Sequence, residues 1–196
     1  MKGSLFATSL LAAAAAVAAA STVHAAEPKY FFQIKEVTAG PDVDPAVKTA
    51  AADALKAELA SRPEWASDIQ ASDQTALVAE LTKRKLRGFD VKVRIETFNQ
   101  EMKDPRPGGR LKQLAVNVKL VIIGATIPDA KLAFEGIGEA GVEAEVSEKR
   151  MAADSAMASK AAMKSAVKQA VEQAVEKLGA KPAAAPTGKK PAKKKT

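Results

Sequence analysis

Hydrophobic spacing changes period several times along this chain, and each change predicts a new structural element. Apolar residues recur every second position in a strand and every third or fourth position in a helix. The run Tyr30–Val37 is short and rich in strand formers, so it is the first predicted strand. A helix is then predicted from Pro45 to about Ala60, with Asp44 as its N-terminal cap and Pro45 in its first turn.

The middle of the chain predicts a second helix and then a strand. Apolar spacing places the helix at about Thr75–Leu86, with basic residues in its last turn and Gly88 suited to its exit. From Phe89 the period becomes two. Three apolar residues alternate with charged ones there, which is typical of a half-buried strand: Val91, Val93 and Ile95.

The last part of the body predicts two more strands and a long helix. The clearest alternation in the chain is Leu114–Ile122, and a further strand is predicted from Leu132 to about Val146. An Ala-rich helix follows over Met151–Leu178, and Gly179 is expected to end it. The order β-α-α-β-β-β-α predicts an α+β fold, with a mostly antiparallel sheet of three to four strands and two to three helices packed on one face.

The N-terminus has the pattern of a cleavable secretory signal peptide. Lys2 precedes the uncharged apolar run Leu5–Ala20, and the small residues Val23 and Ala25 lie two positions apart, as signal peptidase requires. Residues 1–25 are therefore predicted to be removed, and the mature chain is expected in the periplasm or outside the cell. The apolar run has 16 residues, fewer than the roughly 20 of a spanning helix, which favours cleavage over an uncut membrane anchor. The sequence contains no second long apolar stretch, so the mature chain is not expected to span a membrane.

Charge divides the mature chain into a neutral body and a basic tail. Residues 26–178 are predicted to form a single domain with about no net charge, whereas residues 179–196 combine Pro, Ala and Lys with no acid. Such a composition predicts an extended, disordered tail. This tail is either a solubilising tether or a contact for polyanions. Its candidate contact residues are Lys181, Lys189, Lys190, Lys193, Lys194 and Lys195.

The residue types of the mature chain exclude several kinds of chemistry. Its sequence has no Cys, and the one His, His24, lies in the predicted signal peptide. Catalytic triads that use His or Cys, and zinc sites built from these residues, are therefore excluded. We predict no catalytic residue, no cofactor and no metal site, and we expect the protein not to be an enzyme.

Three local patterns have both a chemical and a structural interpretation. The segment Gly136–Gly141 matches the G-x-G-x-x-G spacing of dinucleotide sites, but the residues after it alternate like a strand, which favours glycines in a bent or bulged strand. Ser155 and the Ser159-Lys160 pair could form a Ser-Lys couple, although small residues are ordinary on an Ala-rich helix. Trp65 is interpreted as a core residue.

The order of elements resembles that of small envelope domains. The residues that carry this resemblance are Leu86–Phe89 entering a strand, Ala133–Gly136 in a later strand, and the closing Ala-rich helix. Similar domains occur in curli-secretion lipoproteins, in lipoprotein activators of penicillin-binding proteins and in the amino-terminal part of the Tol-system β-propeller protein. The resemblance implies a non-catalytic domain that binds protein partners. This chain departs from the lipoproteins because it has no lipobox Cys.

Two functional hypotheses follow. The first is an exported, non-enzymatic envelope module that binds a protein partner, with a lysine-rich tail that contacts anionic surfaces. The alternative is a surface protein that binds polyanions through the tail: lipopolysaccharide, anionic lipid or extracellular nucleic acid. No small-molecule substrate is expected. The sequence does not predict which residues of the body would contact a protein partner.

Overall fold

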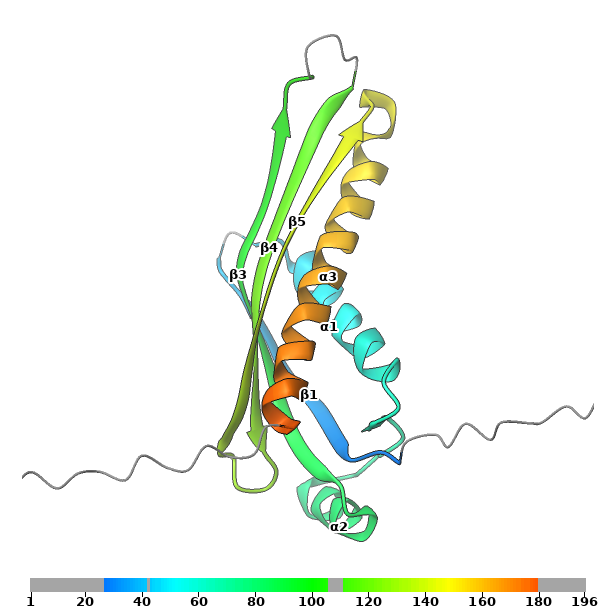
Figure 1. The fold of residues 1–196 in the computed structure, drawn as a ribbon, viewed down its shortest axis with the longest axis vertical. Helices are drawn as coiled ribbons and strands as arrows, with labels where there is room; N and C mark the ends of the chain where they lie inside the picture. The colour runs from blue at the N-terminus through cyan, green and yellow to red at the C-terminus, as the bar shows by residue number, and fades with distance from the viewer. Residues whose placement is uncertain (1–26, 42, 106–110, 180–196) are drawn as a thin grey trace, which may run out of the picture.

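The computed structural model describes residues 27–41, 43–105 and 111–179. The predicted signal peptide lies outside this part, as do residues 180–196 of the predicted tail. The described elements follow the order β-α-β-α-β-β-β-α (Figure 1). A turn of 3₁₀ helix, Glu148–Arg150, leads into the last helix. The elements are β1 (Tyr30–Ala39), α1 (Pro45–Ala60), β2 (Trp65–Ala66), α2 (Gln74–Arg84), β3 (Arg87–Lys103), β4 (Lys112–Thr126), β5 (Leu132–Val146) and α3 (Met151–Gly179).

The sheet is mixed and has five strands in the order β2-β1-β3-β4-β5. The strands β3, β4 and β5 form an antiparallel meander, whereas β1 is parallel to both of its neighbours. The α+β class is confirmed, but the predicted sheet of three to four mostly antiparallel strands is wrong. The prediction did not include β2, because its two residues are too few to show a hydrophobic period. It also missed that the chain between β1 and β3 crosses over and returns in the same direction.

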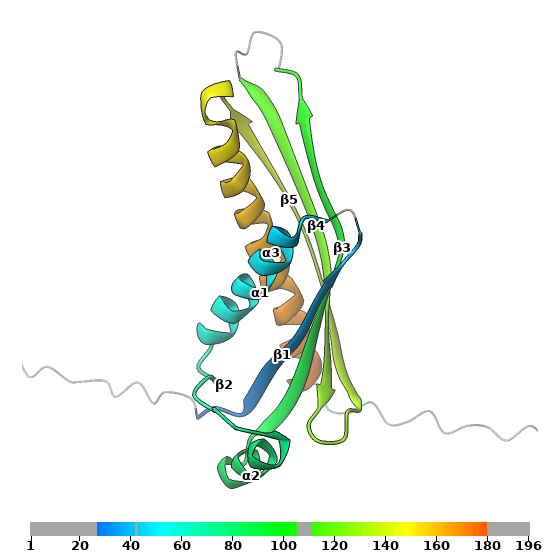
Figure 2. The same ribbon diagram turned by 180° about the vertical axis from the view of Figure 1, so that it is seen from behind.

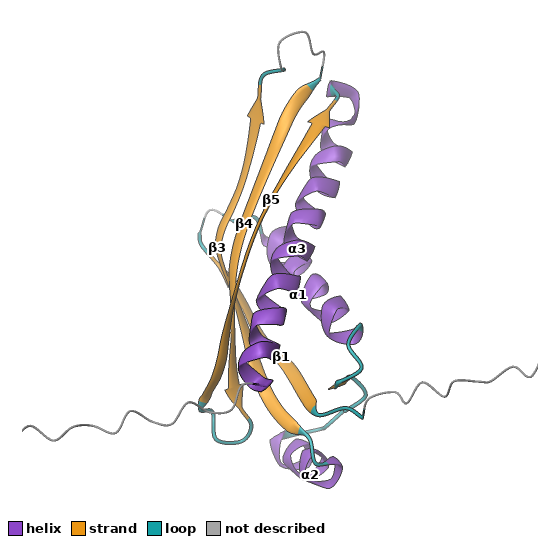
Figure 3. Ribbon diagram, in the orientation of Figure 1, coloured by secondary structure: helices purple, strands orange, loops and turns teal. Residues whose placement is uncertain are grey.

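The prediction that two to three helices pack on one face is confirmed for two of them. Helices α1 and α3 lie together on one face of the sheet, and α2 lies at one end of it (Figures 2 and 3). Adjacent residues of β1 point to opposite faces. Phe32 joins the main core under α1 and α3, while Phe31 is buried with Leu77 and Leu81 of α2. Helix α2 therefore covers the opposite face at the end of β1 and β3.

Helix α3 lies unusually close to β5, and two glycines make this possible. A Cβ atom placed on Gly136 would lie 2.0 Å from the carbonyl oxygen of Ala170, and one on Gly138 would lie 1.8 Å from that of Ala166. Any side chain at either position would collide with the helix backbone. The helix presents a stripe of small buried residues to the same surface: Ala158, Ala162, Ala166, Ala170 and Ala174.

This close contact explains the pattern Gly136–Gly141. The segment lies inside strand β5, as predicted, and the described chain has no helix directly after it that could receive a dinucleotide phosphate. The predicted alternative of a bulge at the glycines is wrong. The irregular pairing of β4 with β5 falls before them, between Gly124 and Ala125. Two of these glycines, Gly136 and Gly138, allow the close packing of α3 instead.

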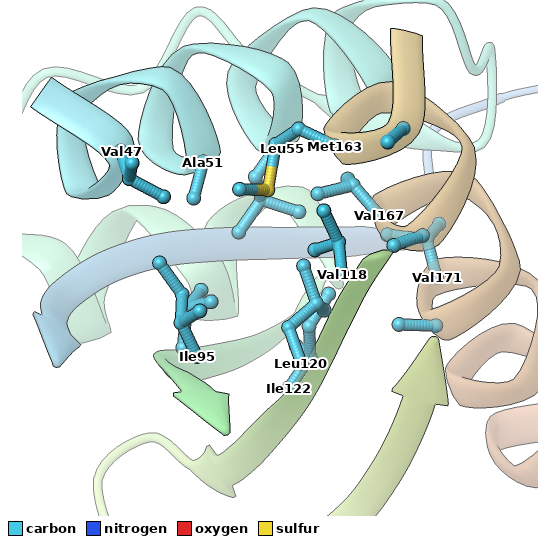
Figure 4. Close-up of a cluster of buried hydrophobic side chains, with 14 of the residues drawn as sticks. Val47, Ala51, Leu55, Ile95, Val118, Leu120, Ile122, Met163, Val167 and Val171 are labelled. Carbon is cyan, nitrogen blue, oxygen red and sulfur yellow. The ribbon is translucent and has the colours of Figure 1, made fainter. Parts of the chain in front are cut away.

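The main core lies between the sheet and the pair of helices α1 and α3. Figure 4 shows α1 contributing Val47, Ala51 and Leu55, and α3 contributing Met163, Val167 and Val171, above apolar strand residues such as Leu120. The predicted alternation in β3 is confirmed, since Val91, Val93 and Ile95 are each 1% exposed while their charged neighbours face solvent.

The predicted helix boundaries are confirmed for α1 and corrected for α2. The Asp44 carboxylate accepts a hydrogen bond from the N–H of Ala46 at 2.7 Å, as an N-terminal cap should. Helix α2 ends at Arg84, because Lys85 adopts the left-handed conformation with φ 57°. Gly88 is not its exit residue. It lies in β3, where a Cβ atom would be 2.4 Å from Leu81 Cδ1, so Gly88 lets α2 approach the sheet.

The helices were also compared with the length and hydropathy of membrane-spanning segments, over residues 27–41, 43–105 and 111–179. None of the helices there is both long and apolar enough to span a bilayer.

The close approach of α3 predicts a sharp difference between two glycines of one strand. Gly138→Ala should destabilise the fold by about 2–3 kcal/mol, because the added methyl forces α3 away from β5. Gly141→Ala is the matched control. Its Cβ atom would lie 2.9 Å from Oδ1 of Asn117, a side chain that can move, so the change should stay within about 0.5 kcal/mol.

Urea unfolding of the two variants and the parent measures both effects. Equal destabilisation by the two alanines would contradict the packing explanation.

Candidate functional site

A groove runs along the outer edge of β1. Its volume is about 830 Å³, within the range of roughly 300–1,000 Å³ that ligand pockets occupy. The strand residues Phe31 to Lys35 line its floor, and the end of α1 forms one wall. The segment from β2 into α2 forms the other. The wall residues are Lys56, Leu59, Ala60, Trp65, Ala66, Ser67, Ile69, Gln70, Ala71, Ser72, Asp73, Gln74 and Leu77.

The floor of this groove is an open strand edge. Strand β2 pairs with β1 at two positions only, Tyr30 with Trp65 and Phe31 with Ala66. The N–H of Tyr30 donates to the Glu64 carbonyl at 3.1 Å, on the β2 side. Alternate residues of a strand direct their backbone groups to the same side, so those of Ile34 face the β2 side as well. Within the described residues no strand lies opposite Ile34 on that side.

A β-bulge limits the length of this edge. The pairing of β1 with β3 shifts register between Ile34 and Glu36, which leaves Lys35 as the extra residue. Bulges and lysines are common means of ending a pairing edge. The regular open stretch of β1 is therefore short, and it coincides with the part that lines the groove.

An aromatic cluster supports the groove from the core side. The ring of Phe32 lies 4.4 Å from that of Trp65, 5.4 Å from that of Phe89 and 5.8 Å from that of Phe134, measured between centroids. Trp65 is 7% exposed, so its predicted core position is confirmed. The guanidinium of Arg62 lies 5.6 Å from the centre of the Trp65 ring, within cation–π distance. These contacts pack Phe32 and Trp65 against the core.

Two residues that line the groove carry buried polar atoms without a hydrogen-bond partner in the described chain. They are the Oε1 atom of Gln33 and the Nε1 atom of Trp65. An unpaired buried donor or acceptor costs about 1–3 kcal/mol, and native proteins contain few of them. Their presence in one groove distinguishes it from ordinary core packing.

Charged groups at the groove leave it slightly basic. The carboxylate of Asp73 already accepts the N–H of Ala76 at 2.8 Å, as the cap of α2. Lys35 lies 3.6 Å from Asp90. Lys56 is exposed and forms no ion pair within the described residues. A ligand entering the groove would therefore meet one lysine without a partner.

One ion pair ties the lip of the groove to α2. Arg84 Nη1 donates to Asp68 Oδ2 at 2.7 Å, and its Nε donates to Glu80 at 2.6 Å. The hydrogen bond from Arg84 lowers the pKa of Asp68 below its ordinary value. Asp68 lies between Ser67 and Ile69, which line the groove. The pair therefore positions the segment that forms this wall.

The other sheet edges differ from that of β1. Helix α3 covers part of β5, because the N–H groups of Ile137 and Glu139 donate to the side chains of Gln173 and Gln169 at 3.0 Å and 2.7 Å. The ammonium of Lys177 donates to the carbonyl of Glu135. Beyond β1, the edge of β3 from Thr97 onward has no described partner strand, but no wall encloses it.

The residues singled out in the sequence do not converge on this groove, apart from Trp65. The lysines proposed as polyanion contacts, from Lys181 to Lys195, lie outside the described residues. On α3, the Ser159 hydroxyl donates to the carbonyl of Ser155 at 2.7 Å and accepts from Gln100. It is thus engaged as an ordinary helix serine, and Lys160 faces solvent.

The groove could not be predicted from the sequence because its floor depends on how the strands pair. A usable signal existed in Tyr30–Ile34, where apolar residues fall on both faces of the strand, and in the aromatic residue Trp65, two positions after Pro63. Neither shows that β2 ends after two residues. Within the part of the chain that the structure describes, no group of three or more His, Cys, Asp or Glu side chains could hold a metal ion.

Comparisons with known proteins give a structural likeness only. No protein-family model matches the sequence, and no curated protein matches it. A DUF330 protein from Xanthomonas campestris has 13% identity and a TM-score of 0.45, covering 78% of this chain and 88% of its own. A minor lipoprotein from Acinetobacter baumannii has 8% identity and a TM-score of 0.39, covering 76% and 93%.

PelC from Paraburkholderia phytofirmans, which forms a dodecamer in its structure, has 9% identity and a TM-score of 0.39, covering 74% of this chain and 88% of its own. All three TM-scores are below 0.5 and all three identities are below 25%, so these likenesses carry no conclusion about the function of this chain.

The Asp68–Arg84 pair predicts local order at the groove lip. Arg84→Ala should speed amide hydrogen exchange over residues 67–72 and leave the thermal midpoint nearly unchanged, because surface ion pairs contribute little to global stability. Lys83→Ala is the matched control, since Lys83 is in the same helical turn and does not contact Asp68.

Lowering the pH should speed amide hydrogen exchange over residues 67–72, as Arg84→Ala does. Because the pKa of Asp68 is lowered in the folded protein, its ion pair with Arg84 stabilises the lip fully above the ordinary Asp pKa of about 3.9. This stabilisation is lost as the pH falls through the lower pKa of the folded protein. Exchange over residues 67–72 that is insensitive to both Arg84→Ala and acid would contradict this role.

Proposed function

We propose that this chain is an exported, non-catalytic module that binds a protein partner in the groove along β1. The single observation that supports this most is the open strand edge inside a cavity of about 830 Å³. Backbone N–H and C=O groups in folded proteins are nearly always paired. Here backbone groups of β1 form the floor, and such groups are what a polypeptide partner pairs with.

The lining favours binding over catalysis. The charged residues among those that line the groove are Lys35, Lys56 and Asp73. Asp73 is engaged as a helix cap and Lys35 lies near Asp90, so no acid and base face each other across the groove. The mature sequence also supplies neither His nor Cys. Apolar and aromatic surface with a few polar groups is typical of protein recognition.

Export is part of the same proposal. It is supported by the apolar run Leu5–Ala20 and the small residues before Ala26, which have the form of a signal peptide. The six lysines after Gly179 add a second, weaker contact with anionic surfaces, which salt would screen. The folded body, with about no net charge, would then recognise the partner, while the tail raises its local concentration near a negatively charged surface.

Retention on isolated cell envelopes separates the two contacts. The mature protein should remain bound through a rising salt series, and deletion of residues 180–196 should weaken retention only at low salt. Ala60→Phe, which fills the groove from α1, should reduce salt-resistant retention by about tenfold or more. Ala57→Phe is the matched control, because Ala57 is exposed on the same helix and does not line the groove.

Two results would count against the proposal. Retention that disappears with salt or with the tail would favour the polyanion-binding alternative. Salt-resistant retention that Ala60→Phe leaves intact would place partner recognition on another surface of the body. Thermal unfolding of both phenylalanine variants shows that each is folded before retention is compared.

A further inference from the structure

Strand β2 stops beside β1 where the groove begins. Its two residues pair with Tyr30 and Phe31, and the chain then turns away through Ser67. The third, fourth and fifth residues of a longer β2 would occupy the space beside Phe32, Gln33 and Ile34. Trp65, Ala66 and Ser67 all line the groove, so the cavity continues the line of an existing pairing.

We propose that the bound partner segment is an extended polypeptide that continues the line of β2 and pairs with the edge of β1 beside Ile34. This inference rests on the proposed function and specifies the chemistry of its partner. A peptide main chain presents a donor and an acceptor at each residue, as does the open edge of Ile34. A sugar or lipid tail does not offer this alternation at strand spacing.

The bulge at Lys35 determines how much of the segment can pair. Beyond Ile34 the register of β1 shifts, so regular pairing stops there. The paired stretch is only a few residues long, and its main-chain hydrogen bonds alone give weak binding, since each contributes about 0.5–1.5 kcal/mol in water. Side chains of the segment must therefore supply the rest of the affinity.

The two walls specify those side chains. Successive residues of a strand point to opposite sides. One side of the groove offers Phe32, Leu59 and Trp65, and the other offers Ile69 and Leu77 near Phe31. An apolar residue on the segment suits the first side. Lys56 projects from the α1 wall without an ion pair among the described residues, so an acidic side chain on the segment would complement it.

The unpaired polar atoms fit the same occupant. Gln33 Oε1 lacks a donor and Trp65 Nε1 lacks an acceptor within the described residues. A polypeptide supplies both kinds of group, so a small shift of these side chains toward an inserted strand would satisfy them. Trp65 is the single tryptophan in the chain, which makes its fluorescence a direct report of groove occupancy.

The probe is a peptide selected from random twelve-residue sequences displayed on phage. The phage are first depleted on the Ala60→Phe variant and then selected on the mature protein. Synthetic copies of the recovered peptides should change Trp65 fluorescence and slow amide exchange of Ile34 by about tenfold or more on binding. They should also share an acidic residue next to apolar ones.

Two pairs of variants test the backbone and the charge separately. Ile34→Pro removes the edge N–H and should weaken peptide binding by about tenfold, while Ile34→Val, which keeps the N–H, should stay within about twofold.

Lys56→Glu should weaken peptide binding by about fivefold. Lys48→Glu makes the same charge change on α1 away from the groove and should not weaken binding.

If Ile34→Pro fails to fold, exchange of Ile34 in the unmodified protein decides the question alone. Peptides that bind without slowing this exchange, or a selection that yields no groove-dependent peptide, would overturn strand pairing. If envelope retention is still lost in Ala60→Phe, the proposed function stands and the partner docks as a folded surface. Concentration-dependent dimers that Ala60→Phe abolishes would instead make the occupant a second copy of this chain, which also overturns the inference.

Discussion

The contact between the backbone of α3 and strand β5 is the constraint on which the rest of the fold depends. Gly136 and Gly138 leave no side chain between the strand and the carbonyl oxygens of Ala170 and Ala166. A chain with few aromatics has little bulky material for its core. Close approach compensates, because many small atoms in contact give dispersion energy comparable to fewer large side chains. The alanines of α3 are therefore as necessary as the glycines.

This close contact also decides which sheet edge remains available. At its short distance from β5, α3 places Gln169, Gln173 and Lys177, spaced four residues apart, against the outer backbone groups of that strand. The same arrangement cannot exist at β1. Helix α1 packs against α3 and leaves the edge of β1 beyond β2 uncovered by any described strand. The groove follows from how the two helices share one face.

Local sequence patterns predicted the helices and strands well, but they did not predict how the strands pair. The helix Pro45–Ala60 was predicted to its ends and the alternating part of each strand was located correctly, because capping and period depend on neighbouring residues, but β3 continues past its alternating part to Lys103. The parallel position of β1 and the place of α2 on the opposite face depend on contacts between distant residues, such as Phe31 with Leu77. The groove depends on where β2 stops pairing, so no sequence pattern predicted its lining except for Trp65.

The parallel pairing of β1 with β3 has a consequence for the order in which the molecule forms. The hydroxyl of Thr38 donates to the carbonyl of Val93, 55 positions along the chain. The meander of β3, β4 and β5 instead joins neighbours in sequence, so its loops close at lower entropic cost. We expect the meander with α3 to assemble first and β1 to add to it afterwards. Strand β1 would then be the last of these elements to join the sheet, and the groove along its outer edge would form only at the end of folding.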